Sequence, residues 1–189
     1  ETGQIDVNDI NGYVLNLTNF KEQQALLGVT TTSLNAKLLG KADLDVGLTI
    51  PYDEETFQMT IDVGKINTKY LNPTLMPLVG IEFTQGQIYK IHYELDAGPK
   101  TGQNKLVFDY KDLKLSVVDK DEDGVKRKDG LLSTIANAAI RPNNMPGDKK
   151  YLTASYETER NIYRAPINYF IKGLMEGAIR IVPGKTVRN

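Results

Sequence analysis

Apolar and polar residues alternate one by one over most of this chain, and that alternation limits the folds open to it. Successive side chains of a β-strand point to opposite faces of a sheet, so a period of two is typical of a strand with one buried face. The cleanest run contains Phe57, Met59, Ile61 and Val63. Because short, turn-rich segments separate such runs, we expect an antiparallel sheet with one apolar and one polar face.

We expect about six strands, at residues 5–17, 34–50, 57–63, 89–95, 106–117 and 152–159. In the first, we expect a break at Asn11–Gly12 and place Tyr13 and Leu15 on the apolar face. The second is long enough to need a kink near Gly40. In the fifth, the alternation changes phase over Lys111–Asp112, which predicts a β-bulge.

Three segments interrupt the strands and have helical spacing, at residues 72–80, 130–140 and 165–182. Asn72 is the expected N-cap of the first, with Pro73 at its first helical position. We therefore predict an α+β fold that forms a single domain over residues 1–189. A curved antiparallel sheet carries two or three helices on its apolar face.

The last of these helices has a broad apolar stripe that has two interpretations. It closes the core of the protein, or it contacts lipid. Gly173 and Gly177, four residues apart, permit a close approach of the helix backbone to a neighbour. Lys172, Glu176 and Arg180 form a ladder of charges on the opposite side. The stripe includes Phe170, Ile171, Leu174 and Ala178.

Composition excludes several classes of protein. The net charge of −1 provides no general attraction to nucleic acid, and the absence of cysteine excludes disulfides and Cys-bound zinc. No apolar run reaches the roughly 18 residues that a membrane-spanning helix needs. The chain begins with Glu1 and not with methionine, so we expect it to be a piece of a longer protein.

Residues 119–124 and His92 are the two candidates for a metal or catalytic site. Residues 119–124 (DKDEDG) match the first half of a calcium loop, but Gly130 stands where the loop needs a bidentate Glu. His92, the only histidine, falls on the face opposite Ile91, where we expect solvent. We therefore predict no metal, no cofactor and no catalytic residue, and we expect a protein that is not an enzyme.

Four segments in the last 120 residues together resemble the C-terminal region of AsmA-like proteins of the bacterial envelope. This branch is common in Bacteroidetes and was long described as a domain of unknown function. The similar segments are residues 70–95, 104–118, 131–147 and 156–177. Residues 1–68 match only as amphipathic strands. The chain departs from the family pattern at Asn161, where an acidic residue is expected.

The resemblance implies a periplasmic, β-rich protein anchored in the inner membrane, with an apolar groove for lipid that serves outer-membrane assembly or integrity. We therefore expect a lipid or a membrane surface as partner, with another envelope protein as a further possibility. The alternative is a module that pairs with a partner strand through a sheet edge, without lipid. The residues expected to contact lipid or a partner are Phe57, Met59, Ile61, Val63, Phe170, Ile171, Leu174 and Ala178.

Overall fold

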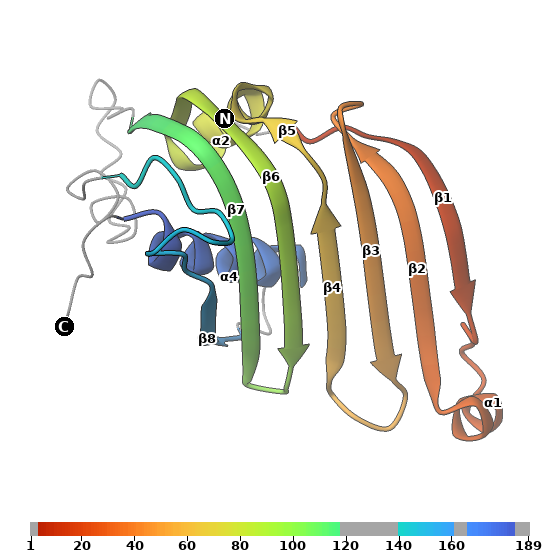
Figure 1. The fold of residues 1–189 in the computed structure, drawn as a ribbon. Coiled ribbons are helices and arrows are strands. Elements are labelled where there is room, and N and C mark those ends of the chain that lie inside the picture. Colours follow the sequence, from red (N-terminus) through yellow and green to blue (C-terminus); the bar gives the residue numbers. More distant parts are fainter. Residues whose placement is uncertain (1–3, 118–139, 161–165, 184–189) are drawn as a thin grey trace, which may run out of the picture.

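The fold is built on one eight-stranded antiparallel sheet (Figure 1). A computed structural model describes residues 4–117, 140–160 and 166–183, and these contain three α-helices and one 3-10 helix. The prediction of an antiparallel sheet combined with helices is confirmed. The prediction of about six strands is wrong, because one expected strand is two and a short strand was missed.

Seven strands follow one another across the sheet in the order β1-β2-β3-β4-β6-β7-β8, and β5 pairs with β6. The strands are β1 (Val7–Leu15), β2 (Val29–Leu38), β3 (Ala42–Pro51), β4 (Phe57–Val63), β5 (Ile66–Asn67), β6 (Ile81–Ala97), β7 (Thr101–Val117) and β8 (Ala154–Glu159). The helices are α1 (Lys21–Leu27), η1 (Thr68–Leu71), α2 (Asn72–Val79) and α4 (Pro166–Ile181).

The expected long strand at residues 34–50 is a hairpin of β2 and β3. The chain reverses at Leu39 and Gly40, whose φ angles are 54° and 62°, and the N–H of Lys41 donates to the carbonyl of Leu38. Positive φ at both central residues is typical of the tight turns that join antiparallel strands. Leu38 pairs with Ala42 across the hairpin, so alternation continues in phase through the turn and hides it.

β-Bulges set the faces of the outer and central strands. The pairing of β6 with β7 shifts between Gln85 and Gln87, opposite Asp112 with its φ of 53°, which confirms the bulge predicted there. In β1 the shift lies at Asp9, before the predicted break. Tyr13 pairs with Ser33 on the polar face of β2, so our placement of Tyr13 and Leu15 on the apolar face was wrong.

We call the apolar side of the sheet its inner face. Its register runs from Leu34 through Val46, Ile61 and Tyr93 to Leu106 on five successive strands. The opposite, outer face carries Asp45, Asp62 and His92 in the neighbouring row. In Figure 1, α4 crosses behind β6 and β7, on the inner face, whereas no described helix lies over β1, β2 and β3. The inner face is therefore covered over one half only.

The two other α-helices lie at the ends of strands. α1 follows β1, and α2 packs beside β6. Asn72 is the first residue of α2 and not its N-cap, because its side chain exchanges two hydrogen bonds with the backbone of Phe83. Gly80 ends α2 in the left-handed conformation. The calcium-like loop at 119–124 and the predicted helix at 130–140, apart from Ile140, lie outside the described residues.

Candidate functional site

The candidate site is an apolar cavity of about 410 Å³ between the inner face of the sheet, α4 and α2, which we call the trough. Its volume falls in the range of about 300–1,000 Å³ that is usual for small-molecule sites. The walls expose no polar surface. The sheet and the start of the described chain contribute Ile5, Val7, Leu38, Leu39, Leu44, Val46, Ile61, Val63, Ile81, Phe83, Ile88, Ile91, Tyr93, Leu106, Phe108 and Leu115, and the helices and their flanks contribute Leu71, Thr74, Leu75, Phe170, Leu174, Met175, Ala178 and Val182.

The polar groups of the lining residues are turned away from the trough by hydrogen bonds. The hydroxyl of Thr74 donates to the carbonyl of Gln4, and the hydroxyl of Tyr93 donates to Oδ1 of Asn104 at 2.5 Å. Burial raises the pKa of Tyr93 well above its usual value, so this phenol is neutral at physiological pH. An occupant of the trough therefore meets hydrocarbon and no fixed charge.

The apolar stripe of α4 consists of two rows of residues, one that packs in the core and one that lines the trough. Tyr169, Gly173, Gly177 and Ile181, each four residues apart, are buried. Phe170, Leu174 and Ala178, displaced by one residue, are half-buried and line the trough. One row closes the core, and the next row forms a wall of the trough.

Buried tyrosines under α4 account for its two glycines. A Cβ on Gly173 would overlap the hydroxyl oxygen of Tyr93, and a Cβ on Gly177 would overlap that of Tyr156. The Tyr156 hydroxyl donates to the carbonyl of Gly173 at 2.6 Å. The prediction that these glycines permit close approach is confirmed, and the neighbour is the protein's own sheet.

The trough opens beside β1. Ile5 and Val7, which line it, remain 51% and 38% exposed. On the inner face beyond them, Val14 and Ile50 are also exposed. A monomer seldom leaves a connected apolar surface in water unless that surface meets another apolar body.

Five of the eight predicted contact residues line the trough and three do not. Ile61, Val63, Phe170, Leu174 and Ala178 are among its lining residues. Phe57 and Met59 lie further along the inner face of β4, half-buried against the core, and Ile171 is half-buried on α4. The guanidinium of Arg160 stacks 5.3 Å from the centre of the Phe57 ring.

Sequence reasoning missed the walls that α2 and the β2–β3 hairpin supply. Leu71 and Leu75 come from a short helical segment with two prolines, and Leu39 comes from a turn. The alternation over 42–50 did indicate that Leu44 and Val46 share a face with Ile61. The sequence predicted helices on that face, with residues 72–80 among them, but it did not indicate that Leu71 and Leu75 would line a cavity there.

His92 is not a free surface side chain. Its Nδ1 lies 2.8 Å from Oδ1 of Asp62, its Nε2 lies 3.1 Å from Oε1 of Glu94, and Lys105 bonds the other oxygen of Glu94 at 3.0 Å. Partial burial alone lowers the pKa of His92, but its hydrogen bonds to Glu94 and Asp62 outweigh burial, and the pKa lies above the ordinary 6.5. Because carboxylates only accept, both contacts are hydrogen bonds when both ring nitrogens carry a proton, so the arrangement favours the imidazolium form.

This cluster offers little chemistry. The two carboxylates lie on opposite sides of the imidazole and do not converge on a common point. In the described ranges no three acidic or histidine side chains gather so that they could hold a metal ion. The cluster joins β4, β6 and β7 on the outer face, away from the trough.

The comparisons with known proteins identify no relative. Neither family models, nor curated proteins, nor solved structures match this chain. Among the described residues, no helix combines the length and the apolar character that crossing a membrane requires.

Proposed function

We propose that this protein is a non-enzymatic lipid-binding module whose trough takes up the acyl chain of a lipid. The observation that carries the proposal is an open cavity of about 410 Å³ whose walls expose only apolar surface. If a methylene takes about the volume of a liquid water, roughly 30 Å³, this cavity accommodates on the order of 14 carbons, or one acyl chain.

Burial of the acyl chain in the trough supplies the free energy of binding. Each methylene removed from water contributes about 0.8 kcal/mol, before the cost of ordering the chain is subtracted. The absence of exposed polar groups in the walls means that the headgroup stays outside, at the open side near Ile5 and Val7. The trough therefore recognises the acyl chain of a lipid and not its headgroup.

The resemblance to AsmA-like proteins gives this activity a setting. In that setting the module belongs to a periplasmic protein anchored in the inner membrane, and it serves lipid transfer and the assembly or integrity of the outer membrane. An open trough supports transfer better than a closed cavity does, because a chain can enter and leave without unfolding of the walls.

Filling the trough tests the proposal. Ala178→Phe adds a phenyl ring to the wall without adding charge, and Ala25→Phe makes the same change on an exposed position of α1. We expect native mass spectrometry of wild-type protein and Ala25→Phe to show a bound lipid with an acyl chain. Ala178→Phe should keep its circular dichroism spectrum and lose the lipid, together with its affinity for a fluorescent fatty acid.

Two results would contradict the proposal. One is wild-type protein that carries no lipid and does not bind the fatty acid. The other is an Ala178→Phe variant, folded as judged by its thermal transition, that binds as tightly as wild type.

A second candidate function rests on the sheet edge. All nine residues of β1 are exposed, and β1 has a neighbour on one side only. Such an edge can pair with a strand of another protein. Tyr13 and Leu15 pair with odd-numbered residues of β2, whose backbone groups face β1, so the N–H of Val14 between them points to the free edge. Pro at Val14 would remove that donor. If this second function is correct, Val14→Pro abolishes partner capture and leaves fatty-acid binding intact.

A further inference from the structure

Lysines stack on exposed tyrosines at one end of the sheet. Nζ of Lys41 lies 5.3 Å from the ring centre of Tyr70. The ring of Tyr89 has Nζ of Lys65 at 5.0 Å and Nζ of Lys111 at 5.7 Å. Tyr70 and Tyr89 are 49% and 36% exposed, so water reaches both rings. We call Lys41, Lys65, Lys69, Lys111, Tyr70 and Tyr89 the Lys-Tyr surface.

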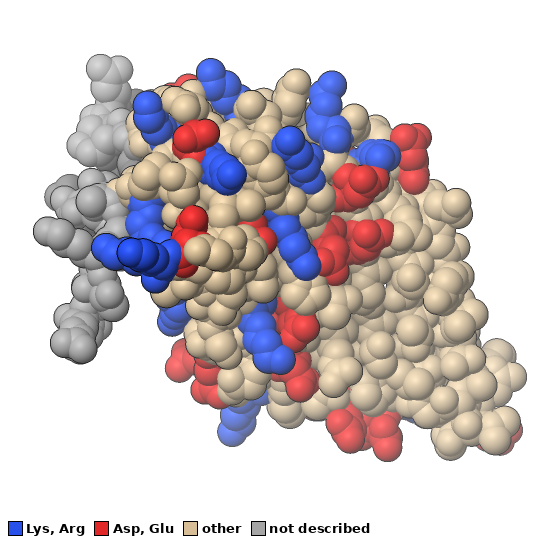
Figure 2. All heavy atoms as spheres, in the orientation of Figure 1, with Lys and Arg blue, Asp and Glu red and all other residues tan. Residues whose placement is uncertain are grey.

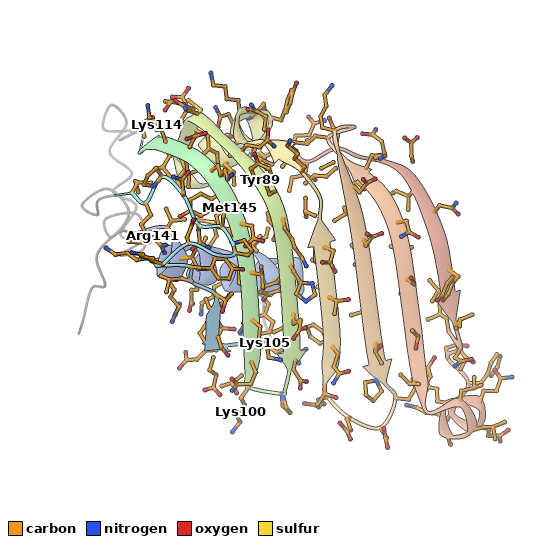
Figure 3. All side chains as sticks on the ribbon, in the orientation of Figure 1. Tyr89, Lys100, Lys105, Lys114, Arg141 and Met145 are labelled. Atoms are coloured by element: carbon orange, nitrogen blue, oxygen red, sulfur yellow. The ribbon has the colours of Figure 1, made fainter. Side chains whose placement is uncertain are left out.

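The charges of this surface are not neutralised within the described part of the chain. None of its four lysines forms an ion pair there, whereas Lys37, Lys105 and Lys172 each pair with a carboxylate. Figure 3 labels Lys114 on the same end of β7, and it has no ion pair with any described residue. Stacking on a tyrosine ring holds a lysine in place without cancelling its charge.

Acidic side chains gather at the other end of the sheet. The turn between β3 and β4 carries Asp53, Glu54 and Glu55, all exposed. Figure 2 shows lysines over the upper end of β6 and β7, with acidic side chains beside some of them, and further acidic side chains along the lower rim. The whole chain has a net charge of only −1, so attraction to an anionic surface depends on the unpaired lysines at this end and not on an overall excess of positive charge.

We propose that the Lys-Tyr surface docks on a bilayer that contains anionic phospholipid. Lysines close to such a surface are attracted to it, and tyrosines favour the boundary between headgroups and hydrocarbon. Met76 of α2, 38% exposed at the same end, adds an apolar side chain, which favours a membrane over a nucleic acid as the partner. The turn with Asp53, Glu54 and Glu55 is repelled, which favours an orientation with the Lys-Tyr surface on the membrane.

This orientation places one end of the trough at the membrane. Leu39 and Leu71, which line the trough, are close in sequence to Lys41 and Tyr70. Docking holds whether or not the trough takes up a chain, so the two proposals can fail separately.

Co-sedimentation with vesicles tests the docking surface. The probes are phosphatidylcholine vesicles with and without phosphatidylglycerol, at low and at high salt. We expect wild-type protein to bind the anionic vesicles only, and less at high salt, where charges are screened. Each lysine contributes about fivefold in affinity, so Lys65→Gln/Lys111→Gln should bind roughly twentyfold more weakly.

The matched control makes the same charge change at the acidic end. Lys21→Gln/Lys100→Gln removes two exposed lysines there and should bind as wild type or more weakly by less than about twofold. Equal binding to both kinds of vesicle, equal losses in the two double variants, or tighter binding to duplex DNA than to anionic vesicles would overturn the proposal. Lys65→Gln/Lys111→Gln should still bind the fluorescent fatty acid, because neither lysine lines the trough.

Discussion

The hydroxyl oxygen of Tyr93, on β6, fills the space that a side chain on Gly173 of α4 would occupy. That hydroxyl donates to Oδ1 of Asn104, whose amide in turn donates to the carbonyl of Gly102 and the hydroxyl of Thr158. All of these groups are buried. The helix lies close to the sheet because a glycine and a satisfied polar network meet there, and this contact fixes the wall of the trough.

Gly173→Ala should destabilise the protein, although alanine is the better helix former by about 1 kcal/mol. The new methyl group meets Tyr93 and also Asn104 Oδ1, 2.6 Å from its position, so α4 must move away from the sheet. Overpacking of this kind costs about 1–3 kcal/mol. Urea denaturation measures the change in the free energy of unfolding.

A neighbouring exposed position and a second-site change provide the controls for that variant. Lys172→Ala should change stability by less than about 0.5 kcal/mol. Tyr93→Phe in the Gly173→Ala background removes one of the two overlaps and should recover part of the loss. A Gly173→Ala variant that is more stable than wild type would show that the contact is not tight.

The two rows of α4 should respond differently to charge. Ile181 is fully buried, so Ile181→Glu places an unpaired carboxylate in the core and should abolish the cooperative thermal transition. Leu174 faces the open trough, so Leu174→Glu should lower the melting temperature modestly and remove fatty-acid binding. Phe170→Glu should lie between them, because Phe170 also packs edge-on against Tyr93, with ring centres 5.5 Å apart.

Lys172→Glu, on the polar side of α4, is the charge control for this series. Its ion pair with Glu176, at 3.9 Å, contributes only a few tenths of a kcal/mol. The idea that the row through Leu174 forms a trough wall fails if Leu174→Glu unfolds the protein as completely as Ile181→Glu does.

His92 and Glu94 should make the free energy of unfolding depend on pH. It should have a plateau between about pH 4.5 and pH 6.5 and should fall on either side. Because the folded pKa of His92 is raised, its contribution is complete below about pH 6.5 and is lost as pH rises through the folded pKa. The hydrogen bonds from His92 and Lys105 lower the pKa of Glu94, so its contribution is present above about pH 4.5 and is lost on acidification. Since the partners are partly exposed, each contribution is below about 1 kcal/mol.

Melting temperatures measured across this pH range for wild type and His92→Gln check the prediction. His92→Gln should be less stable than wild type near pH 6 and equal to it at alkaline pH. His92→Gln should leave lipid binding unchanged, because the cluster lies on the outer face. An identical pH profile in the two proteins would contradict the assignment of an imidazolium.

Asn144→Leu should be among the most damaging single changes outside α4. Asn144 is fully buried and its side chain makes three hydrogen bonds, to the carbonyls of Phe108 and Leu152 and from the N–H of Leu152, at 2.8–2.9 Å. Leucine has a similar size but leaves these backbone groups without partners, which costs roughly 2–4 kcal/mol. Asn143→Leu, at an exposed position where water can replace the one hydrogen bond that the side chain accepts from the N–H of Asp112, should cost less than about 1 kcal/mol in the same denaturation experiment.

The sequence predicts a structural feature when the pattern that indicates it lies within one strand or one helix. The alternation in β4 and the stripe of α4 each concern one element, and both predictions agree with the structure. The β2–β3 turn was missed although it is local, because pairing of Leu38 with Ala42 preserves the phase of the alternation. α1 was not predicted, since its seven residues are too few to show a helical period and none of them is buried.

The sequence by itself determined a two-faced antiparallel sheet, the bulge near Asp112 and an amphipathic last helix, because these follow from side-chain periods of two and 3.6. Only the tertiary structure decided that Gly173 faces Tyr93 while Leu174, the next residue, faces a trough. The position of α4 on the sheet sets that division, and it results from contacts between residues about 80 positions apart in the chain. Periodicity tells which side chains avoid water, but only packing tells whether protein covers them.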